Sequence, residues 1–264
     1  MKRRNFHTHT QFCDGRNTVA EMARAAVEQG FEVIGFTPHA PVPIQSPCNM
    51  SMDDVPQYLE EVRRANEQYA GSCRFLAGME IDYLGPDCNA ASPCYVNLDL
   101  DFCISSVHFI PDQKGELVDV DGKYERFKRN LEVHFGNDIR YVVETFYNRS
   151  MDMLRTGGFT ILGHFDKIAQ NASYYDPGIE QRDWYRALID RYIDLIIESG
   201  VTVEINTKAR VEHGRFFPHE RYWPRLIAAG VPLVVNSDAH YADRLDASRG
   251  EALAMLKSMG YDRA

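Results

Sequence analysis

Histidines and carboxylates recur along this chain in a spacing that could hold metal ions. Near the N-terminus the stretch HTHTQFCDG places His7 and His9 two residues apart, with Asp14 five residues further on. Alternate side chains of a β-strand point to the same face, so such a pair at a strand end directs two imidazoles to one point, as metal ligands do. An isolated pair of this kind is more often part of a solvated N-terminal arm, so the rest of the chain has to decide.

Other potential ligands stand at the ends of apolar runs. These are His39, Glu80, His108, His164 and Asp238, with His240 two residues beyond Asp238. Each alone could cap a turn, form an ion pair or lie satisfied in the core. Their joint recurrence favours a metal site. With the first three they make nine positions, too many for one zinc ion but suited to two or three ions that share a carboxylate. Imidazole and carboxylate without thiolate suit zinc, iron or manganese.

The elements that must position these residues are predicted from apolar periodicity. Seven short runs rich in Val, Ile and Phe predict buried parallel strands at 5–9, 32–37, 74–80, 102–108, 159–164, 201–206 and 232–237. Helical periodicity predicts helices at 20–28, 55–69, 141–154, 184–198, 222–228 and 248–259, and residues 84–99 are predicted to be irregular. Such alternation implies a parallel sheet, open or closed into a barrel, whose strand C-termini share one rim.

Length and charge limit the class of protein. The chain has 264 residues, of which 44% are hydrophobic and 25% charged, which is typical of a globular protein, and we expect a single domain over 1–264. Its formal net charge of -9 argues against general electrostatic binding of long nucleic acid or of an anionic membrane. We find no signal peptide or membrane span and expect a cytoplasmic protein. The six cysteines form no C-x-x-C pair, and we expect reduced thiols.

The motifs resemble those of the polymerase-and-histidinol-phosphatase (PHP) superfamily, and within it the histidinol-phosphatase branch. In chain order they are HTHTQFCDG (7–15), FTPHAP (36–41), GMEIDY (78–83), SSVHF (105–109), LGHFDK (162–167), EINTK (204–208) and NSDAH (236–240). The resemblance covers almost the full length and implies an α/β fold, a distorted seven-stranded (β/α)7 barrel similar to a TIM barrel.

The resemblance also implies three divalent ions, of zinc, manganese or iron, and a set of ligands for each. The first ion would take His7, His9, Glu80 and Asp238, the second would share Glu80 with His108 and His164, and the third would take Asp14, His39 and His240. Asp14, Glu80 and Asp238 would be the catalytic carboxylates. The implied reaction is hydrolysis of a small phosphorylated metabolite by metal-activated hydroxide, with L-histidinol phosphate of histidine biosynthesis as the expected substrate.

Basic residues near the same strand ends are candidates for contact with the substrate. They are Lys167, Lys208, Arg210, Arg215 and His219, and for each a solvated surface role is an equal alternative. The aromatic and basic segment 211–223 could recognise the organic half of a substrate through His213, His219 or Phe217, or could simply pack over the barrel end. The oligomeric state stays open.

Three other functions remain as alternatives. A barrel amidohydrolase also begins with H-x-H and ends with a late aspartate, but it needs a lysine at the fourth strand end, where this chain has His108. A nuclease or nucleotide phosphatase of the same superfamily is compatible with a mononucleotide or a short oligonucleotide. A module that binds metal without turnover would have lost ligands, whereas all nine positions are filled here.

Overall fold

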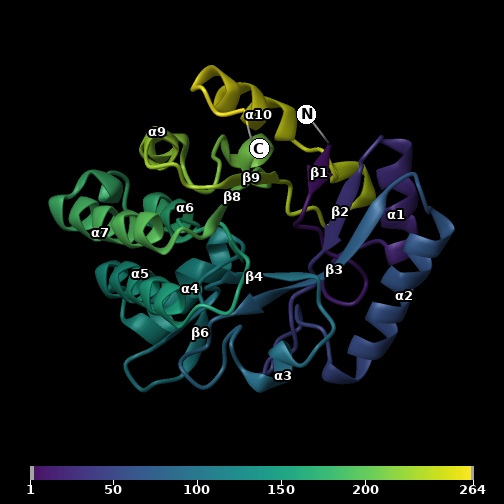
Figure 1. The fold of residues 1–264 in the computed structure, drawn as a ribbon. Coiled ribbons are helices and arrows are strands. Elements are labelled where there is room, and N and C mark those ends of the chain that lie inside the picture. The colour runs from purple at the N-terminus through teal and green to yellow at the C-terminus, as the bar shows by residue number, and fades with distance from the viewer. Residues whose placement is uncertain (1–2, 263–264) are drawn as a thin grey trace.

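Seven parallel strands form a nearly closed barrel surrounded by helices (Figure 1). The computed structural model describes residues 3–262. In spatial order the strands are β1 (Arg4–Asn5), β2 (Val33–Phe36), β3 (Arg74–Asp82), β4 (Phe102–Ser106), β7 (Ile161–Leu162), β8 (Thr202–Asn206) and β9 (Leu233–Asn236). Each predicted strand is present, all six strand pairings are parallel, and the predicted α/β barrel is confirmed.

The barrel closes along a short seam between its first and last strands. β1 has only two residues, so the predicted strand over 5–9 is too long, and closure depends on a parallel bridge between Thr8 and Ala239. The His9 backbone N–H donates to Ala239 O at 2.8 Å, and Ala239 N–H donates to His7 O at 3.3 Å. The seam therefore forms at the rim where the predicted ligands lie.

Helices cover the outside of the barrel. The six predicted helices correspond to α1 (Val19–Glu28), α2 (Val55–Gln68), α5 (Ile139–Thr156), α7 (Asp183–Ser199), α9 (Trp223–Ala228) and α10 (Arg249–Ser258). Local chemistry marks their ends: Thr18 and Glu21 form a capping box that begins α1, and Gly200, at φ 65°, ends α7 in the left-handed region. No helix in the described part of the chain is long and apolar enough to cross a membrane.

Several elements were not predicted from periodicity. They are the hairpin of β5 (Phe109–Pro111) and β6 (Leu117–Asp119), the helices α3 (Pro93–Val96), α4 (Tyr124–Phe135), α6 (Ile168–Tyr175) and α8 (Arg210–His213), and the 3-10 turns η1 (Met52–Asp54), η2 (Ile179–Gln181), η3 (Glu220–Tyr222) and η4 (Ala242–Arg244). The segment 84–99, predicted to be irregular, contains only the single turn of α3. The hairpin, α6 and α8 all follow strand C-termini, so they add walls at the ligand-bearing rim.

The interior of the barrel is filled by the ring of Phe102, which packs with Ile104 and Ile161. Two glycines on neighbouring strands make room for this ring. A Cβ atom added to Gly35 would lie 2.4 Å from the Phe102 ring, and one added to Gly78 would lie 2.7 Å from it. Atoms cannot approach so closely, so glycine at these positions allows an aromatic side chain to fill the barrel. All six cysteines are free, as expected.

We predict that Gly35→Ala destabilises the protein by about 1–3 kcal/mol, because the added methyl group overpacks the barrel against Phe102. Urea unfolding followed by circular dichroism measures the free energy of unfolding. Gly250→Ala is the matched control, since its Cβ meets open space within α10, and we expect it to be neutral or stabilising by up to about 1 kcal/mol. Equal effects of the two substitutions would contradict the packing argument.

Candidate metal centre

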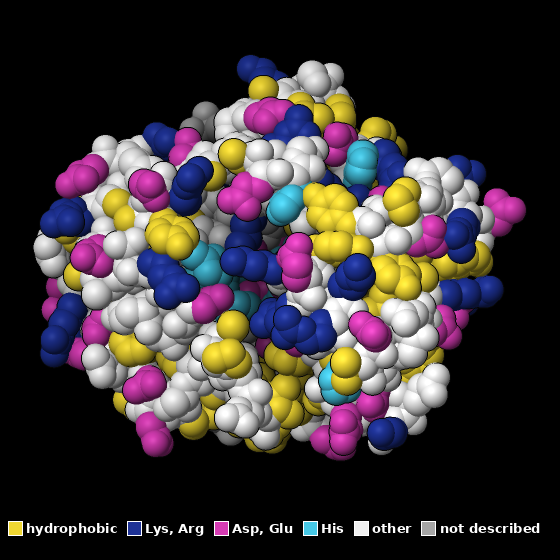
Figure 2. Space-filling view, turned by 180° about the vertical axis from the view of Figure 1, so that it is seen from behind, with side chains coloured by type: hydrophobic (Ala, Val, Ile, Leu, Met, Phe, Trp, Pro, Cys, Tyr) yellow, Lys and Arg dark blue, Asp and Glu magenta, His cyan; other side chains and the backbone are white. Residues whose placement is uncertain are grey.

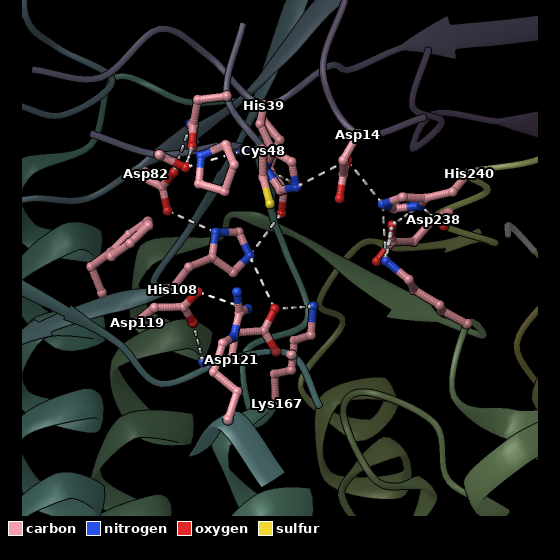
Figure 3. A pocket seen from close by; sticks show the side chains of 18 of the residues that line it. Asp14, His39, Cys48, Asp82, His108, Asp119, Asp121, Lys167, Asp238 and His240 are labelled. Atoms are coloured by element: carbon pink, nitrogen blue, oxygen red, sulfur yellow. Dashed lines mark hydrogen bonds and ion pairs between the residues drawn. The ribbon is translucent and has the colours of Figure 1, made fainter. Parts of the chain in front are cut away.

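Six of the nine predicted ligands line one cavity of about 340 Å³ at the C-terminal rim of the barrel; they are Asp14, His39, Glu80, His108, Asp238 and His240. Figure 2 shows the face of the molecule on which this hollow opens, with histidine side chains inside it and charged side chains around its edge. In Figure 3, Asp14, Asp238 and His240 lie on one side, and His108, Asp121 and Lys167 lie on another. The cavity thus gathers side chains that are more than 200 residues apart in the chain.

Glu80 lies at the centre of the cluster, and its two carboxylate oxygens face different histidines. Oε2 is 3.2 Å from His7 Nε2 and 3.1 Å from His39 Nδ1. Oε1 is 2.8 Å from His164 Nε2 and 3.5 Å from His108 Nε2. A carboxylate whose oxygens face two separate groups of imidazoles can be shared between cations, which is the arrangement expected of a bridging ligand.

Two further carboxylates complete the cluster. His9 Nε2 lies 3.1 Å from Asp238 Oδ1, and His240 Nε2 lies 3.2 Å from Asp14 Oδ1. His39 Nε2, at 3.8 Å from Asp14 Oδ1, links this part to Glu80. Asp238 has a φ of 50°, an uncommon conformation that is seen most often at sites where surrounding structure enforces it. The structure therefore brings all nine predicted ligands into one cluster. The sets of donor atoms close enough to share an ion are His9, Asp14, His39 and His240; His7, His9 and Glu80; and His39, Glu80 and His108, so they overlap the three implied ligand sets without matching them.

Three buried polar atoms of the cluster have no hydrogen-bond partner and are of the kinds that coordinate cations. The Nε2 atoms of His7 and His9 and the Oδ1 atom of Asp14 are buried and have no hydrogen-bond partner. Buried polar atoms are otherwise almost always paired, since an unpaired one costs about 1–3 kcal/mol. All three atoms are potential metal donors that face neighbouring donors. Divalent cations bound within the cluster would give each of these atoms a partner.

Electrostatics in the cluster favour positive charge. Burial lowers the pKa of His9, His39 and His164, which keeps their imidazoles neutral and able to coordinate. Burial opposes ionisation of Glu80 too, but the surrounding histidines hold its pKa well below the usual range. Burial also works against protonation of His108, yet Asp82 and Glu80 raise its pKa to about 9. Carboxylates that attract a proton so strongly also attract a metal cation.

Carboxylates outside the predicted set hold the imidazoles in position. His7 Nδ1 donates to Glu204 Oε1 at 2.7 Å, and His108 Nδ1 donates to Asp82 Oδ1 at 2.7 Å. Such hydrogen bonds fix the tautomer that leaves Nε2 free for a metal. Neither carboxylate was identified from the sequence, although both stand within the motifs compared there. Asp82 is two residues after Glu80 on β3 and so shares its face, which is the signal that could have revealed it.

Two of the five basic candidates reach the cavity. Lys167 and Lys208 both line it; Lys167 Nζ lies 2.8 Å from Asp121 Oδ2, and Lys208 Nζ lies 3.1 Å from Asp238 Oδ1. The acidic loop that ends in Asp121 was not singled out from the sequence either. Its place beside the site depends on the unpredicted β5–β6 hairpin.

The other three basic candidates are engaged elsewhere. Arg210 pairs with Glu251, and Arg215 pairs with Asp166 and Glu180 in a largely buried network. His219 Nδ1 lies 3.3 Å from a Glu220 carboxylate oxygen and accepts from Arg221 N–H. The structure does not bring these three side chains to the first cavity. The ion pairs of Arg210 and Arg215 connect this part of the rim to other elements of the fold.

The fold and the site together define a barrel protein with a buried cluster of histidines and carboxylates suited to several divalent cations. Comparison with known protein families identifies the family to which the chain belongs. The model of the PHP domain matches residues 5–208, and the chain belongs to this family. The motif resemblance seen in the sequence is thereby confirmed.

Individual relatives are distant in sequence but similar over nearly their whole length. The chain is 25% identical to the histidinol-phosphatase of Bacillus subtilis, over 92% of this chain and 95% of that protein. A Listeria monocytogenes protein proposed to be a histidinol phosphatase has the same fold, with a TM-score of 0.80 and 19% identity over 94% of this chain and 99% of that one.

A further structure carries ligands. The histidinol phosphate phosphatase of Lactococcus lactis, solved with zinc, L-histidinol and phosphate, aligns with a TM-score of 0.68 and 17% identity, over 98% of this chain and 94% of that one. At these identities the structural likenesses establish the fold.

We predict that Glu204→Gln weakens metal binding about 10- to 100-fold, because His7 loses the anionic acceptor that orients its ring. Titration with zinc against a competing chelator measures the affinity. Glu144→Gln, which removes an exposed carboxylate paired with Arg140 on α5, is the control and should leave the affinity unchanged. An unaltered zinc affinity in Glu204→Gln would contradict the orienting role.

Proposed function

We propose that this protein is a metal-dependent phosphomonoesterase that hydrolyses L-histidinol phosphate to L-histidinol and phosphate. The observation that carries the proposal is the position of Glu80. Its two carboxylate oxygens face separate groups of histidines, at a site with buried donor atoms that have no hydrogen-bond partner. The histidinol-phosphatases among the relatives support the choice of substrate. Histidine biosynthesis and a cytoplasmic location are parts of the same proposal.

The proposed cofactors are three divalent cations of zinc, manganese or iron. His7, His9, Glu80 and Asp238 would hold the first, Glu80, His108 and His164 the second, and Asp14, His39 and His240 the third. Such ions, when bound, neutralise the charge of a phosphate dianion and lower the pKa of water to about 7. Hydrolysis of the phosphate ester then needs no serine or cysteine nucleophile from the chain.

The chain's own residues supply binding and orientation. The carboxylates of Asp14, Glu80 and Asp238 give the site the negative charge that retains cations. Lys167 and Lys208 are cationic side chains on the cavity wall, where they can donate hydrogen bonds to phosphate oxygens. The burial of His7, His9 and Glu80 excludes bulk water, which strengthens every charge interaction inside. In the hydrolysis the oxygen of one water molecule bonds to phosphorus as the bond from phosphorus to the ester oxygen breaks, and a proton from that water ends on the ester oxygen, so that the alcohol leaves neutral.

We predict that the purified, metal-loaded protein releases phosphate from L-histidinol phosphate with a kcat/KM at least about tenfold above that for AMP and other phosphomonoesters. A phosphate-release assay across the panel measures this ratio, and removal of metal with a chelator should abolish activity until zinc or manganese is restored. Preference for a nucleotide would instead identify a nucleotide phosphatase of the same family.

We predict close to three metal ions per chain and the loss of more than one ion in Glu80→Ala, because both oxygens of Glu80 face donor groups. Elemental analysis of the purified proteins gives the counts. Glu198→Ala is the control, since this exposed carboxylate at the end of α7 belongs to no group of potential ligands in the described residues, and its removal should leave the count unchanged. Loss of a single ion with activity retained would contradict a bridging role for Glu80.

A further inference from the structure

The tip of the β5–β6 hairpin carries a group of potential metal ligands that lies apart from the metal centre. Asp112 and Glu116 in the turn of the hairpin and His134 in the last turn of α4 each offer one ligand atom, and these atoms lie within 4.8 Å of one another. None of the three residues lines the cavity of the metal centre. Phe109 and Asp119, at the other end of the hairpin, do line it, and three steps along the strands, about 10 Å, separate them from the turn.

Helix α4 packs against β6 (Figure 1), and side chains four residues apart on the helix face the hairpin. Arg126 Nη2 lies 2.7 Å from Asp119 Oδ2, and Asn130 Nδ2 donates to Asp119 O at 2.8 Å. The next residue in this row is His134, whose Nδ1 atom lies 3.9 Å from Asp112 Oδ2, which is too far for a hydrogen bond. Two ligands that each lie about 2.1 Å from one zinc ion are about 3.3–4 Å apart, so this gap has the size that an ion fills.

The two carboxylate oxygens of Asp112 differ in their partners. Oδ1 accepts from the backbone N–H groups of Lys114 and Glu116 at 2.8 and 2.9 Å, which builds the turn. Oδ2 accepts no hydrogen bond from any described residue, although the side chain is only 4% exposed. Burial works against ionisation of Asp112, but the same two N–H groups and the charge of Lys114 lower its pKa, so the carboxylate is charged. A buried, charged oxygen without a partner favours the binding of a cation.

The other two side chains of the group are free to coordinate. Neither ring nitrogen of His134 forms a hydrogen bond with a described residue, and its side chain is 33% exposed, so an ion can reach it from solvent. Glu116 is exposed, and the hydrogen bond from its backbone to Asp112 holds its main chain beside the buried carboxylate. One imidazole and two carboxylates form a set of ligands that zinc accepts, with water in the fourth position.

We propose that Asp112, Glu116 and His134 form a further zinc site, separate from the metal centre, which links the tip of the β5–β6 hairpin to the last turn of α4. Only three side chains coordinate the ion, and those of Glu116 and His134 are accessible to water. The site is therefore weaker than the metal centre, and it fills when zinc is added to protein that already holds its other metal ions. The inference does not depend on the reaction that the metal centre performs.

Zinc binding by the metal-loaded protein tests the proposed site. After dialysis has removed loosely bound metal, equilibrium dialysis against increasing zinc concentrations should show one additional ion per chain. His134→Ala and Glu116→Gln should each raise the Kd of this ion at least about tenfold, because even the loss of a residue that only orients a ligand weakens metal binding about 10- to 100-fold. Glu132→Gln removes an exposed carboxylate of α4 that lies outside the group, so this matched control should leave the Kd unchanged.

The metal retained after dialysis separates this site from the metal centre. It should be the same in all three variants, because the proposed site shares no ligand with the centre, and circular dichroism should show that each variant is folded. Weaker binding of the additional ion in both ligand variants, with the retained metal unchanged, supports the assignment. The assignment is wrong if no additional zinc binds at millimolar concentration, or if either ligand variant binds it as tightly as the unaltered protein. A fall in the retained metal in both ligand variants would also overturn it, since the ion would then belong to the metal centre.

Discussion

A single buried carboxylate, Glu80, connects the parts of this protein. Its charge would be costly inside a barrel, and the cost is offset by imidazoles from other strand ends around both of its oxygens and by the Ser106 hydroxyl, which donates to Oε1 at 2.8 Å. Those strand ends must meet within a few ångströms, so the site exists only if the sheet closes. The closure in turn occurs among the ligands, where Ala239 exchanges backbone hydrogen bonds with His7 and His9. Barrel geometry and metal chemistry therefore constrain each other.

The same constraint extends outward and inward from the rim. Outward, Glu204 and Asp82 hold the rings of His7 and His108, and Glu204 also accepts from the backbone N–H of His164. One buried carboxylate thereby orients one imidazole and fixes the strand end that carries another. Inward, Phe102 fills the barrel beneath the site, which two glycines on adjacent strands allow. The ligands thus stand on a packed support, as precise metal geometry requires.

The barrel strands and the elements inserted after them contribute to different parts of the site. The strand ends supply the cluster suited to cations, which allows an acidic protein to hold an anionic substrate at one local site. The elements beyond the strands, namely the β5–β6 hairpin, α6 and the segment 209–217, contribute side chains to the walls of the cavities beside this cluster. Catalytic chemistry can then stay the same across a family while the choice of substrate changes through the loops.

The sequence by itself predicted the seven strands and singled out nine side chains that the structure gathers at one rim, because apolar runs that end in His, Glu or Asp are local patterns and the strand ends of a parallel barrel must converge. It did not reveal α4, α6 or the β5–β6 hairpin, whose packing is decided by distant parts of the chain. Among the basic residues only the tertiary structure distinguished Lys167 and Lys208, which reach the cavity, from Arg210 and Arg215, which pair with carboxylates. The physical reason is that a charged side chain acts according to its neighbours in space, and the two carboxylates that pair with Arg215, those of Glu180 and Asp166, are 35 and 49 residues away in the chain.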